Sequence, residues 1–192
     1  MSSQVKAMKS GLRSDLLQQI RNASSVQKKE WSTRIQQNLN NLLSTQQGYW
    51  GAYRPLSDEP EIDWSQVSSQ INWCFPQTLE KNLQFKFAAR SHVKSALGVQ
   101  EPIDGVDVGL DQLQGVVVPG VAFGKNGYRL GRGKGFYDRA LSTFSGKKVG
   151  VCFGLSLKPE TPHEDHDVLF HQIVTENSVY QVDFPEGDIK WN

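Results

Sequence analysis

Apolar residues over the first part of the chain recur at the three- and four-residue spacing of amphipathic helices. The first helical face comprises Val5, Met8, Leu12, Leu16 and Ile20, and the second comprises Trp31, Ile35, Leu39 and Leu42. Ser24-x-x-Gln27 stands directly before the second face and has the composition of a capping box, in which the Ser side chain accepts the backbone N–H of the third residue after it. The pattern therefore predicts two consecutive helices, each with one buried stripe.

Beyond these helices the pattern changes to short apolar runs bounded by turn residues, which is typical of strands. We predict strands over 47–53, 72–76, 83–88, 116–119, 148–153 and 172–175. We also expect a loop rich in Pro and acidic residues over 54–60, a short helix over 64–71, a polar loop over 104–114 and a helix over 137–144. Strands interleaved with helices predict an α/β fold, a three-layer sandwich with a mostly parallel central sheet, in one domain spanning 1–192.

Composition narrows the classes of partner. The formal net charge is +1, so no overall field attracts nucleic acid or a membrane surface, and we expect neither as a partner. No apolar stretch is long enough to span a bilayer, and the N-terminus lacks the apolar core of a secretory signal. Cys74 and Cys152 are the only cysteines, and both lie in apolar runs. We expect both cysteines to be reduced and buried, as in a cytoplasmic protein. We also expect the protein to act as a monomer.

The segment 127–139 carries the strongest chemical signal. Its glycines alternate with Arg132 and Lys134, it follows the apolar run 116–118, and it opens the predicted helix. Free backbone N–H groups and full positive charges at one place suit a polyphosphate. The Walker loop and the dinucleotide fingerprint are excluded, because Tyr128 and Phe136 occupy positions where those motifs need glycine. A plain turn between a strand and a helix is the alternative for this segment.

Several segments of the chain resemble segments of the 5-formyltetrahydrofolate cyclo-ligase family, and they occur in the same order along the sequence as in that family. The central one is 118–123 followed by 129–139, reading Val-Pro-Gly-Val-Ala-Phe and Arg-Leu-Gly-Arg-Gly-Lys-Gly-Phe-Tyr-Asp-Arg. The flanking ones are Lys9-x-x-Leu12-Arg13, Glu61-Ile62-Asp63, Glu101-Pro102, His166-Asp167 and the run 173–176. The resemblance implies ATP-dependent cyclisation of 5-formyltetrahydrofolate to 5,10-methenyltetrahydrofolate, with release of ADP and phosphate. ATP would be the co-substrate, Mg²⁺ the metal and a small-molecule folate the substrate.

The resemblance also implies roles for individual residues, with Arg132 and Lys134 as the catalytic cations. We expect both side chains to be exposed when no ligand is bound. The residues expected at ATP are Lys9, Arg13, Arg129, Leu130, Gly131, Arg132, Gly133, Lys134, Gly135, Phe136 and Tyr137. Those expected at the folate are Leu56, Glu61, Arg132, Gly133, Lys134, Gly135 and Phe136, with Glu61 hydrogen-bonding the pterin, and those expected at the metal are Asp138 and His171.

Other interpretations follow from departures from the family pattern. His171 stands where family members have a metal-binding carboxylate, Ser156 where a Gln is common and Trp64 where a Thr often follows the acidic segment. Imidazole is a poor ligand for Mg²⁺. A catalytically weak paralogue that binds nucleotide or folate is therefore the main alternative. A phosphosugar isomerase-like enzyme would share the α/β layout but gives no reason for the Lys9 and Arg13 pair. The spacing of the histidines over 163–171 matches no standard zinc pattern.

Overall fold

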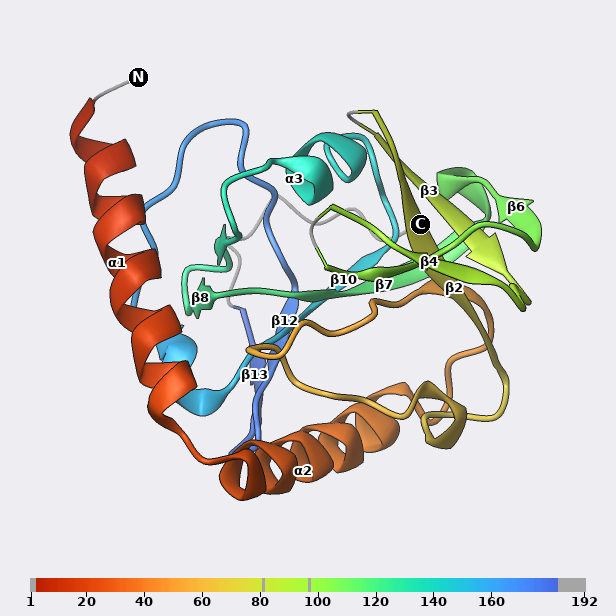
Figure 1. Cartoon of the computed structure of the whole chain (residues 1–192), viewed down its shortest axis with the longest axis horizontal. Coiled ribbons are helices and arrows are strands. Elements are labelled where there is room, and N and C mark those ends of the chain that lie inside the picture. Colours follow the sequence, from red (N-terminus) through yellow and green to blue (C-terminus); the bar gives the residue numbers. More distant parts are fainter. Residues whose placement is uncertain (1–2, 81, 97, 183–192) are drawn as a thin grey trace.

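The computed structural model describes residues 3–80, 82–96 and 98–182, and its centre is a sheet of eight strands (Figure 1). Four neighbouring pairs of strands run parallel and occupy the middle, whereas the pairs toward the two edges are antiparallel. Across the sheet the strands are β13 (Val179–Gln181), β12 (Gln172–Val174), β10 (Lys147–Val151), β7 (Leu113–Pro119), β1 (Gly48–Gly51), β2 (Ile71–Leu79), β3 (Asn82–Phe87) and β6 (Val106–Val108). The predicted α/β fold with a mostly parallel sheet is confirmed.

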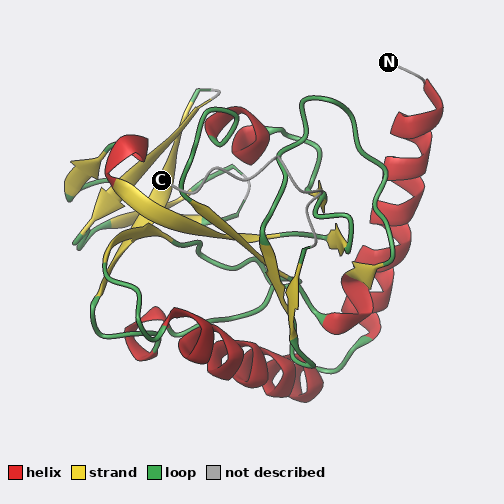
Figure 2. Cartoon of the chain, turned by 180° about the vertical axis from the view of Figure 1, so that it is seen from behind, coloured by secondary structure: helices red, strands yellow, loops and turns green. Residues whose placement is uncertain are grey.

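The helices cover the sheet unequally. Helix α2 (Ser25–Leu43) lies along one face, α3 (Phe136–Ala140) lies on the opposite side, and α1 (Ser3–Asn22) stands beside the sheet (Figures 1 and 2). The remaining elements are β11 (Leu157–Lys158), β8 (Ala122–Gly124) and β9 (Arg129–Leu130) in a small sheet, the β4 (His92–Lys94) and β5 (Gln100–Pro102) hairpin, and 3-10 turns at Trp64–Gln66, Leu110–Gln112 and Gly154–Ser156. No described helix has the length and apolar content that crossing a membrane requires.

The two faces of the sheet carry separate cores, as the two-residue period of a strand requires. On β7, Val117 packs into the cluster under α2 with Leu39 and Trp50, whereas Val116 and Val118 join the cluster on the other face. Because both faces of this strand are covered, its side chains form a continuous apolar run. The uninterrupted valines in the sequence are thus explained by the central position of β7.

Several local predictions can now be compared with the structure. The N-cap at Ser24 is confirmed, since its hydroxyl accepts the N–H of Gln27 at 3.1 Å. Both cysteines are free and buried, and burial raises the pKa of the Cys74 thiol to about 12.

The helix predicted over 64–71 is wrong, because only the turn Trp64–Gln66 forms and Ser68 adopts φ +41° before β2 begins. The helix expected over 137–144 is shorter, and 104–114 contains β6. The domain bounds 1–192 stay a prediction.

Candidate functional site

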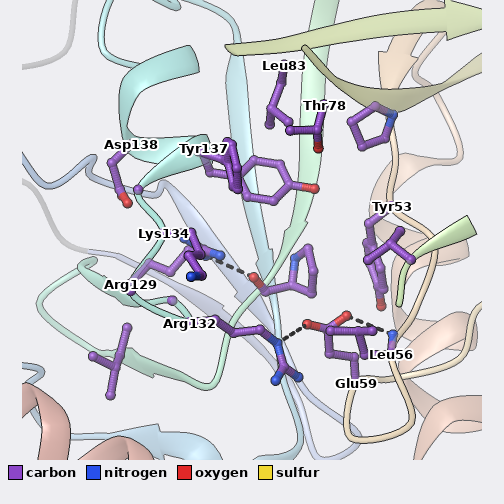
Figure 3. Close-up of a pocket in the computed structure, with 18 of the residues that line it drawn as sticks. Tyr53, Leu56, Glu59, Thr78, Leu83, Arg129, Arg132, Lys134, Tyr137 and Asp138 are labelled. Carbon is purple, nitrogen blue, oxygen red and sulfur yellow. Dashed lines mark hydrogen bonds and ion pairs between the residues drawn. The ribbon is translucent and has the colours of Figure 1, made fainter. Parts of the chain in front are cut away.

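A cavity of about 690 Å³ opens where β1 and β7 end, at the edge of the sheet where α/β proteins bind ligands (Figure 3). One wall is the segment 129–138, which runs from β9 through the glycine loop into α3, and the opposite wall comes from the loop after β1 and from β2, β3 and β5. Residues of α1 and of the loop 164–167 close a third side. Segments far apart in the sequence therefore meet at this one place.

The loop 131–135 takes its shape from glycine. Gly133 has φ +83° and Gly135 has φ +66°, in the left-handed region that costs other residues about 1 kcal/mol. Gly135 also serves as the N-cap of α3, which is only five residues long. A helix this short adds little dipole field, so the positive potential of the loop comes from its side chains. The start of α3 therefore contributes less to anion binding at this loop than the sequence predicted.

Two cations next to the glycine loop, Arg129 and Arg13, hold its backbone in place. The Nε of Arg129 donates to the carbonyl of Pro119 at 2.8 Å, and its guanidinium lies 5.0 Å from the centre of the Tyr137 ring. Arg13, from α1, donates its Nε to the carbonyl of Gly131 at 2.8 Å, and burial lowers its pKa. Lys134 differs, because its side chain is exposed and no described residue forms an ion pair with it. Of these cations, Lys134 is the one free to meet an anionic ligand directly.

Arg132 is held by two acidic residues, contrary to the expected exposed side chain. Its Nη2 pairs with Asp58 and its Nε with Glu59 Oε1 at 3.1 Å, while Glu59 Oε2 accepts the N–H of Leu56 at 3.0 Å. Burial opposes the charge of Arg132, but the charge of Glu59 and the hydrogen bond to Asp58 outweigh it and raise its pKa. The loop after β1 is thereby fastened to the glycine loop across the mouth of the cavity (Figure 3).

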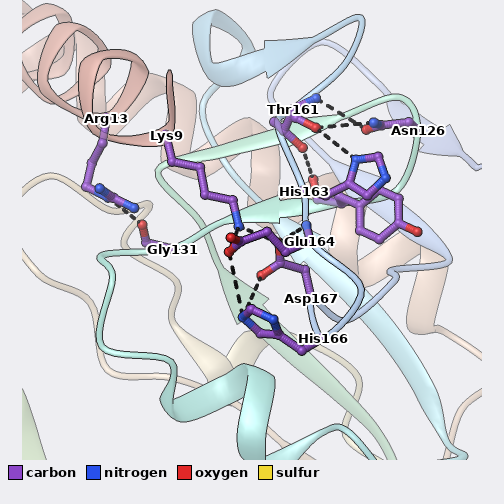
Figure 4. Close-up of polar contacts among 10 residues, drawn as sticks. Lys9, Arg13, Asn126, Gly131, Thr161, His163, Glu164, His166 and Asp167 are labelled. Atoms are coloured by element: carbon purple, nitrogen blue, oxygen red, sulfur yellow. Dashed lines mark hydrogen bonds and ion pairs between the residues drawn. The ribbon is translucent and has the colours of Figure 1, made fainter. Parts of the chain in front are cut away.

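Lys9 is held in the same manner on the other side of the cavity (Figure 4). Its ammonium lies 3.1 Å from Glu164 Oε2 and 2.5 Å from Asp167 Oδ2, and the latter oxygen also accepts the N–H of Glu164 at 2.8 Å. Burial disfavours the charge on Lys9, but the hydrogen bonds to Asp167 and Glu164 outweigh it and raise its pKa. His166 Nε2 is 3.8 Å from Glu164 and 3.9 Å from Asp167. Of these partners, the sequence singled out only the His166-Asp167 pair.

Aromatic side chains form the centre of the cavity. The ring of Tyr137 projects into it with its hydroxyl toward the side of Thr78 and Tyr53 (Figure 3). Burial raises the pKa of both phenols, so each stays neutral and able to donate at physiological pH. Tyr53 donates to the carbonyl of Pro60 at 2.7 Å, which fixes its ring. Phe136 also lines the cavity and lies 5.4 Å from the guanidinium of Arg139.

Two expected site residues do not line this cavity. Glu61 is exposed, and its N–H donates to Ser32 Oγ of α2 at 3.0 Å, so the segment turns toward α2 after Glu59. His171 lies just before β12, where its Nδ1 accepts the N–H of Lys148 at 3.1 Å, and burial followed by the nearby Lys148 charge lowers its pKa to about 4. The structure therefore brings Asp138 to the cavity without His171, and it brings Glu59 in place of Glu61.

The predicted contributors that do line the cavity come from α1, the β1 loop and the glycine loop. They are Lys9, Arg13, Leu56, Arg129, Leu130, Gly131, Arg132, Gly133, Lys134, Gly135, Phe136, Tyr137 and Asp138. Among the described residues no group of three or more His, Cys, Asp or Glu side chains is placed to hold a metal. In the histidine-containing segment 163–171, the His163 ring stacks on Tyr128 with ring centres 3.7 Å apart.

Two cavity residues had no clear signal in the sequence. The guanidinium carbon of Arg54 lies 3.9 Å from the centre of the Phe75 ring, and the buried Nε of Arg54 has no hydrogen-bond partner among the described residues. Burial lowers the pKa of this guanidinium. Glu101 is only 7% exposed and accepts hydrogen bonds from Thr78. The sequence analysis included Glu101-Pro102 among the segments that resemble the family, but the sequence did not indicate that Glu101 contacts Thr78.

Comparisons with known proteins are consistent with this architecture. A model of the 5-formyltetrahydrofolate cyclo-ligase family matches residues 5–176. The chain is 36% identical over 94 residues to the 5-formyltetrahydrofolate cyclo-ligase of Escherichia coli K12, covering 46% of this chain and 52% of the relative. It is 39% identical over 62 residues to that of Mycolicibacterium smegmatis, covering 31% and 32%. The matched segments thus span about half, or less, of these curated relatives.

Solved structures extend the similarity to most of the chain. The 5,10-methenyltetrahydrofolate synthetase of Aquifex aeolicus superposes with a TM-score of 0.79 at 27% identity, covering 95% of this chain and 97% of that one. The synthetase of Mycoplasma pneumoniae superposes with a TM-score of 0.73, covering 88% of this chain and 98% of that one. At 23% identity the second comparison supports the fold alone. The resemblance inferred from the sequence motifs is confirmed.

Proposed function

The chain belongs to the 5-formyltetrahydrofolate cyclo-ligase family, and on this premise we propose that it cyclises 5-formyltetrahydrofolate to 5,10-methenyltetrahydrofolate with ATP. ADP and phosphate are the other products. The observation that carries the proposal is that cationic side chains and apolar side chains line different sides of the cavity. Lys134 comes from the glycine loop, Lys9 and Arg13 come from α1, and Leu83 and Val99 lie on the wall opposite the glycine loop. Such a cavity suits a polyphosphate placed beside a flat, largely apolar ring.

The reaction needs alignment and charge neutralisation rather than a nucleophilic side chain. The formyl oxygen attacks the γ-phosphorus, and the bond to ADP breaks. The lone pair of N10 then attacks the activated formyl carbon, the carbon–oxygen bond breaks to release phosphate, and N10 gives up its proton. Lys134, exposed and unpaired within the described chain, is the group best placed to neutralise charge on the transferring phosphoryl. Arg132 offers a planar fork, held ready by Glu59 and Asp58.

We propose that Asp138 holds the metal that accompanies ATP. Mg²⁺ is commonly bound by one or two carboxylates together with substrate phosphates and water, and Asp138 supplies one hard oxygen ligand at the cavity. When bound, the ion would neutralise charge on phosphate oxygens. His171 is not part of this proposal, because its Nδ1 accepts a backbone hydrogen bond at the start of β12 and it does not line the cavity.

The test is to incubate the purified protein with 5-formyltetrahydrofolate, ATP and Mg²⁺ and to follow the absorbance of the methenyl product. We expect product only when all three are present, and none after removal of the metal with a chelator. If no product forms but folate or ATP still binds, the catalytically weak paralogue replaces the enzyme as the preferred function. We further propose that the protein acts as a monomer in the cytoplasm, which sedimentation and localisation experiments would test.

A further inference from the structure

We propose that Glu101 is a specificity-determining residue that accepts the paired N–H donors of the pterin ring. This inference rests on the proposed function and assigns one part of its substrate to one carboxylate. Glu101 lies in the middle of β5, within the hairpin that packs against β2, and it lines the cavity. The resemblance to the family placed Glu61 at the pterin instead, but the structure leaves Glu61 exposed and outside the cavity.

Glu101 is buried and oriented by two donors from one residue. Its Oε2 accepts the backbone N–H of Thr78 at 2.8 Å, and its Oε1 accepts the Thr78 hydroxyl at 2.9 Å. With 7% of its surface exposed, the side chain has little freedom to turn away. A carboxylate can accept about four hydrogen bonds, so each oxygen retains a free acceptor position. The carboxylate is thus preorganised as a bidentate acceptor.

The other acidic residues at the cavity are committed elsewhere. Glu59 pairs with Arg132 and also accepts the N–H of Leu56, while Glu164 and Asp167 pair with Lys9. Asp138 lies on the far side of Tyr137 from Thr78, the residue that contacts Glu101 (Figure 3). No described cation lies within ion-pair distance of Glu101, so the buried charge has only the neutral donors of Thr78. A buried charge with so few partners is costly unless a ligand provides more donors.

The surroundings of Glu101 define the shape of the group it would meet. Pro76, Leu83, Ala96 and Val99 line the same wall and present an apolar surface. A flat ring with an apolar face and one polar edge fits such a wall. The pyrimidine half of a pterin has this form, because its 2-amino group and its N3–H are two parallel donors matched to a carboxylate.

The nucleotide is a poor match for the same position. Adenine presents an amino donor next to a ring nitrogen that accepts, and that acceptor would face a carboxylate oxygen. The phosphates of ATP carry negative charge and would be repelled by Glu101. Glu101 therefore favours the folate on its wall of the cavity and leaves the space beside the cations of α1 and the glycine loop, Lys9, Arg13 and Lys134, for the nucleotide.

The experiment measures binding without turnover. Dissociation constants for 5-formyltetrahydrofolate, and for its analogue with methyl in place of the 2-amino group, are measured by calorimetry in the absence of ATP. Wild type should bind the analogue at least about 10-fold more weakly. Glu101→Gln keeps the size and an oxygen that Thr78 can reach, and it should weaken binding of the parent folate by about 10- to 100-fold, as expected for loss of a charged hydrogen bond. In this variant the preference for the parent over the analogue should nearly vanish.

Controls separate recognition from folding. Glu160→Gln changes an exposed acidic residue outside the cavity and should bind both ligands as wild type does. If Glu101→Gln does not fold, Glu101→Asp takes its place, since it keeps the charge but withdraws it by one methylene and should also lower the preference. A wild-type preference near one overturns the inference whatever the variants do.

Two further outcomes would also overturn it. The first is an unchanged preference in Glu101→Gln, because a merely structural Glu101 would weaken both ligands alike. The second is loss of the preference in Glu61→Gln instead, which would restore the family assignment. If wild type binds no folate at all, the proposed function fails together with this inference. If wild type binds folate and only the Glu101 result is negative, the proposed function stands.

Discussion

Arg132 and Lys134 should respond differently to replacement by alanine, although they stand two residues apart in the same loop. Lys134 is exposed and unpaired within the described chain, so Lys134→Ala should change the free energy of unfolding by less than about 0.5 kcal/mol. Arg132→Ala leaves the side chains of Asp58 and Glu59, 9% and 12% exposed, without their cation. Breaking a buried pair costs about 3–5 kcal/mol. Because Arg132 itself is 32% exposed, solvent screening reduces the expected loss to about 2 kcal/mol.

Both variants should nevertheless lose activity by a similar amount. Removing one preorganised donor from a site of developing charge costs about 2–4 kcal/mol in the transition state, or roughly 30- to 1,000-fold in kcat/KM. Urea unfolding followed by fluorescence gives the stabilities, and formation of the methenyl product gives the rates. We expect both variants to lose activity, and only Arg132→Ala to lose stability.

A second substitution checks the electrostatic reason. Asp58→Asn should destabilise wild type but should be neutral or stabilising in the Arg132→Ala background, because it removes the charge that was left unpaired. If Arg132→Ala is as stable as wild type, the pair with Asp58 and Glu59 is screened by solvent and the reasoning is refuted. If both alanine variants keep wild-type kinetics, the glycine loop is a plain turn and the proposed phosphate site is lost.

Two further predictions concern buried charges. Lys9→Met should lower the free energy of unfolding by about 2–3 kcal/mol at pH 7, because the side chains of Glu164 and Asp167 are only 12% and 9% exposed. Since the pKa of Lys9 is raised above 10.5, this difference from wild type should persist at pH 9 and shrink above about pH 10.5 in urea titrations. The imidazole of His171 has a pKa of about 4 in the folded protein and about 6.5 in the unfolded chain. Wild type should therefore lose about 1–2 kcal/mol of stability, after solvent screening, as the pH falls from 6.5 to 4. His171→Asn should lack this loss, so its stability should depend less on pH over the same range. Equal slopes in thermal melts over that range would contradict the His171 assignment.

Much of the fold was readable from local pattern. Helical spacing placed the helices that the structure shows as α1 and α2, and Ser24 marked the start of the second. The apolar run at 116–118 identified a strand covered on both faces, which is the central strand β7. These features depend on neighbours within a few residues, so the sequence displays them directly. The same holds for Gly133 and Gly135, whose positive φ values favour glycine.

Local pattern failed where a segment is shaped by what it packs against. The apolar residues over 64–71 suggested a helix, but Trp64 packs edge-on against Tyr53 and donates its Nε1 to the carbonyl of that residue at 2.9 Å. Those tertiary contacts fix an extended route into β2 after one turn. The helix after the glycine loop was also overestimated, and it ends at Ala140.

The chemistry of the site divided in the same way between sequence and tertiary structure. The sequence alone determined the glycine loop, its cations and the family, because these lie in one continuous motif. Only the tertiary structure decided that Lys9 meets Glu164 and Asp167, which are 155 and 158 residues away, and that Glu101 rather than Glu61 lines the cavity. An acidic residue looks the same in a sequence whether it is solvated, paired or buried. Its role depends on burial and on partners brought together by the sheet, and no local spacing records either.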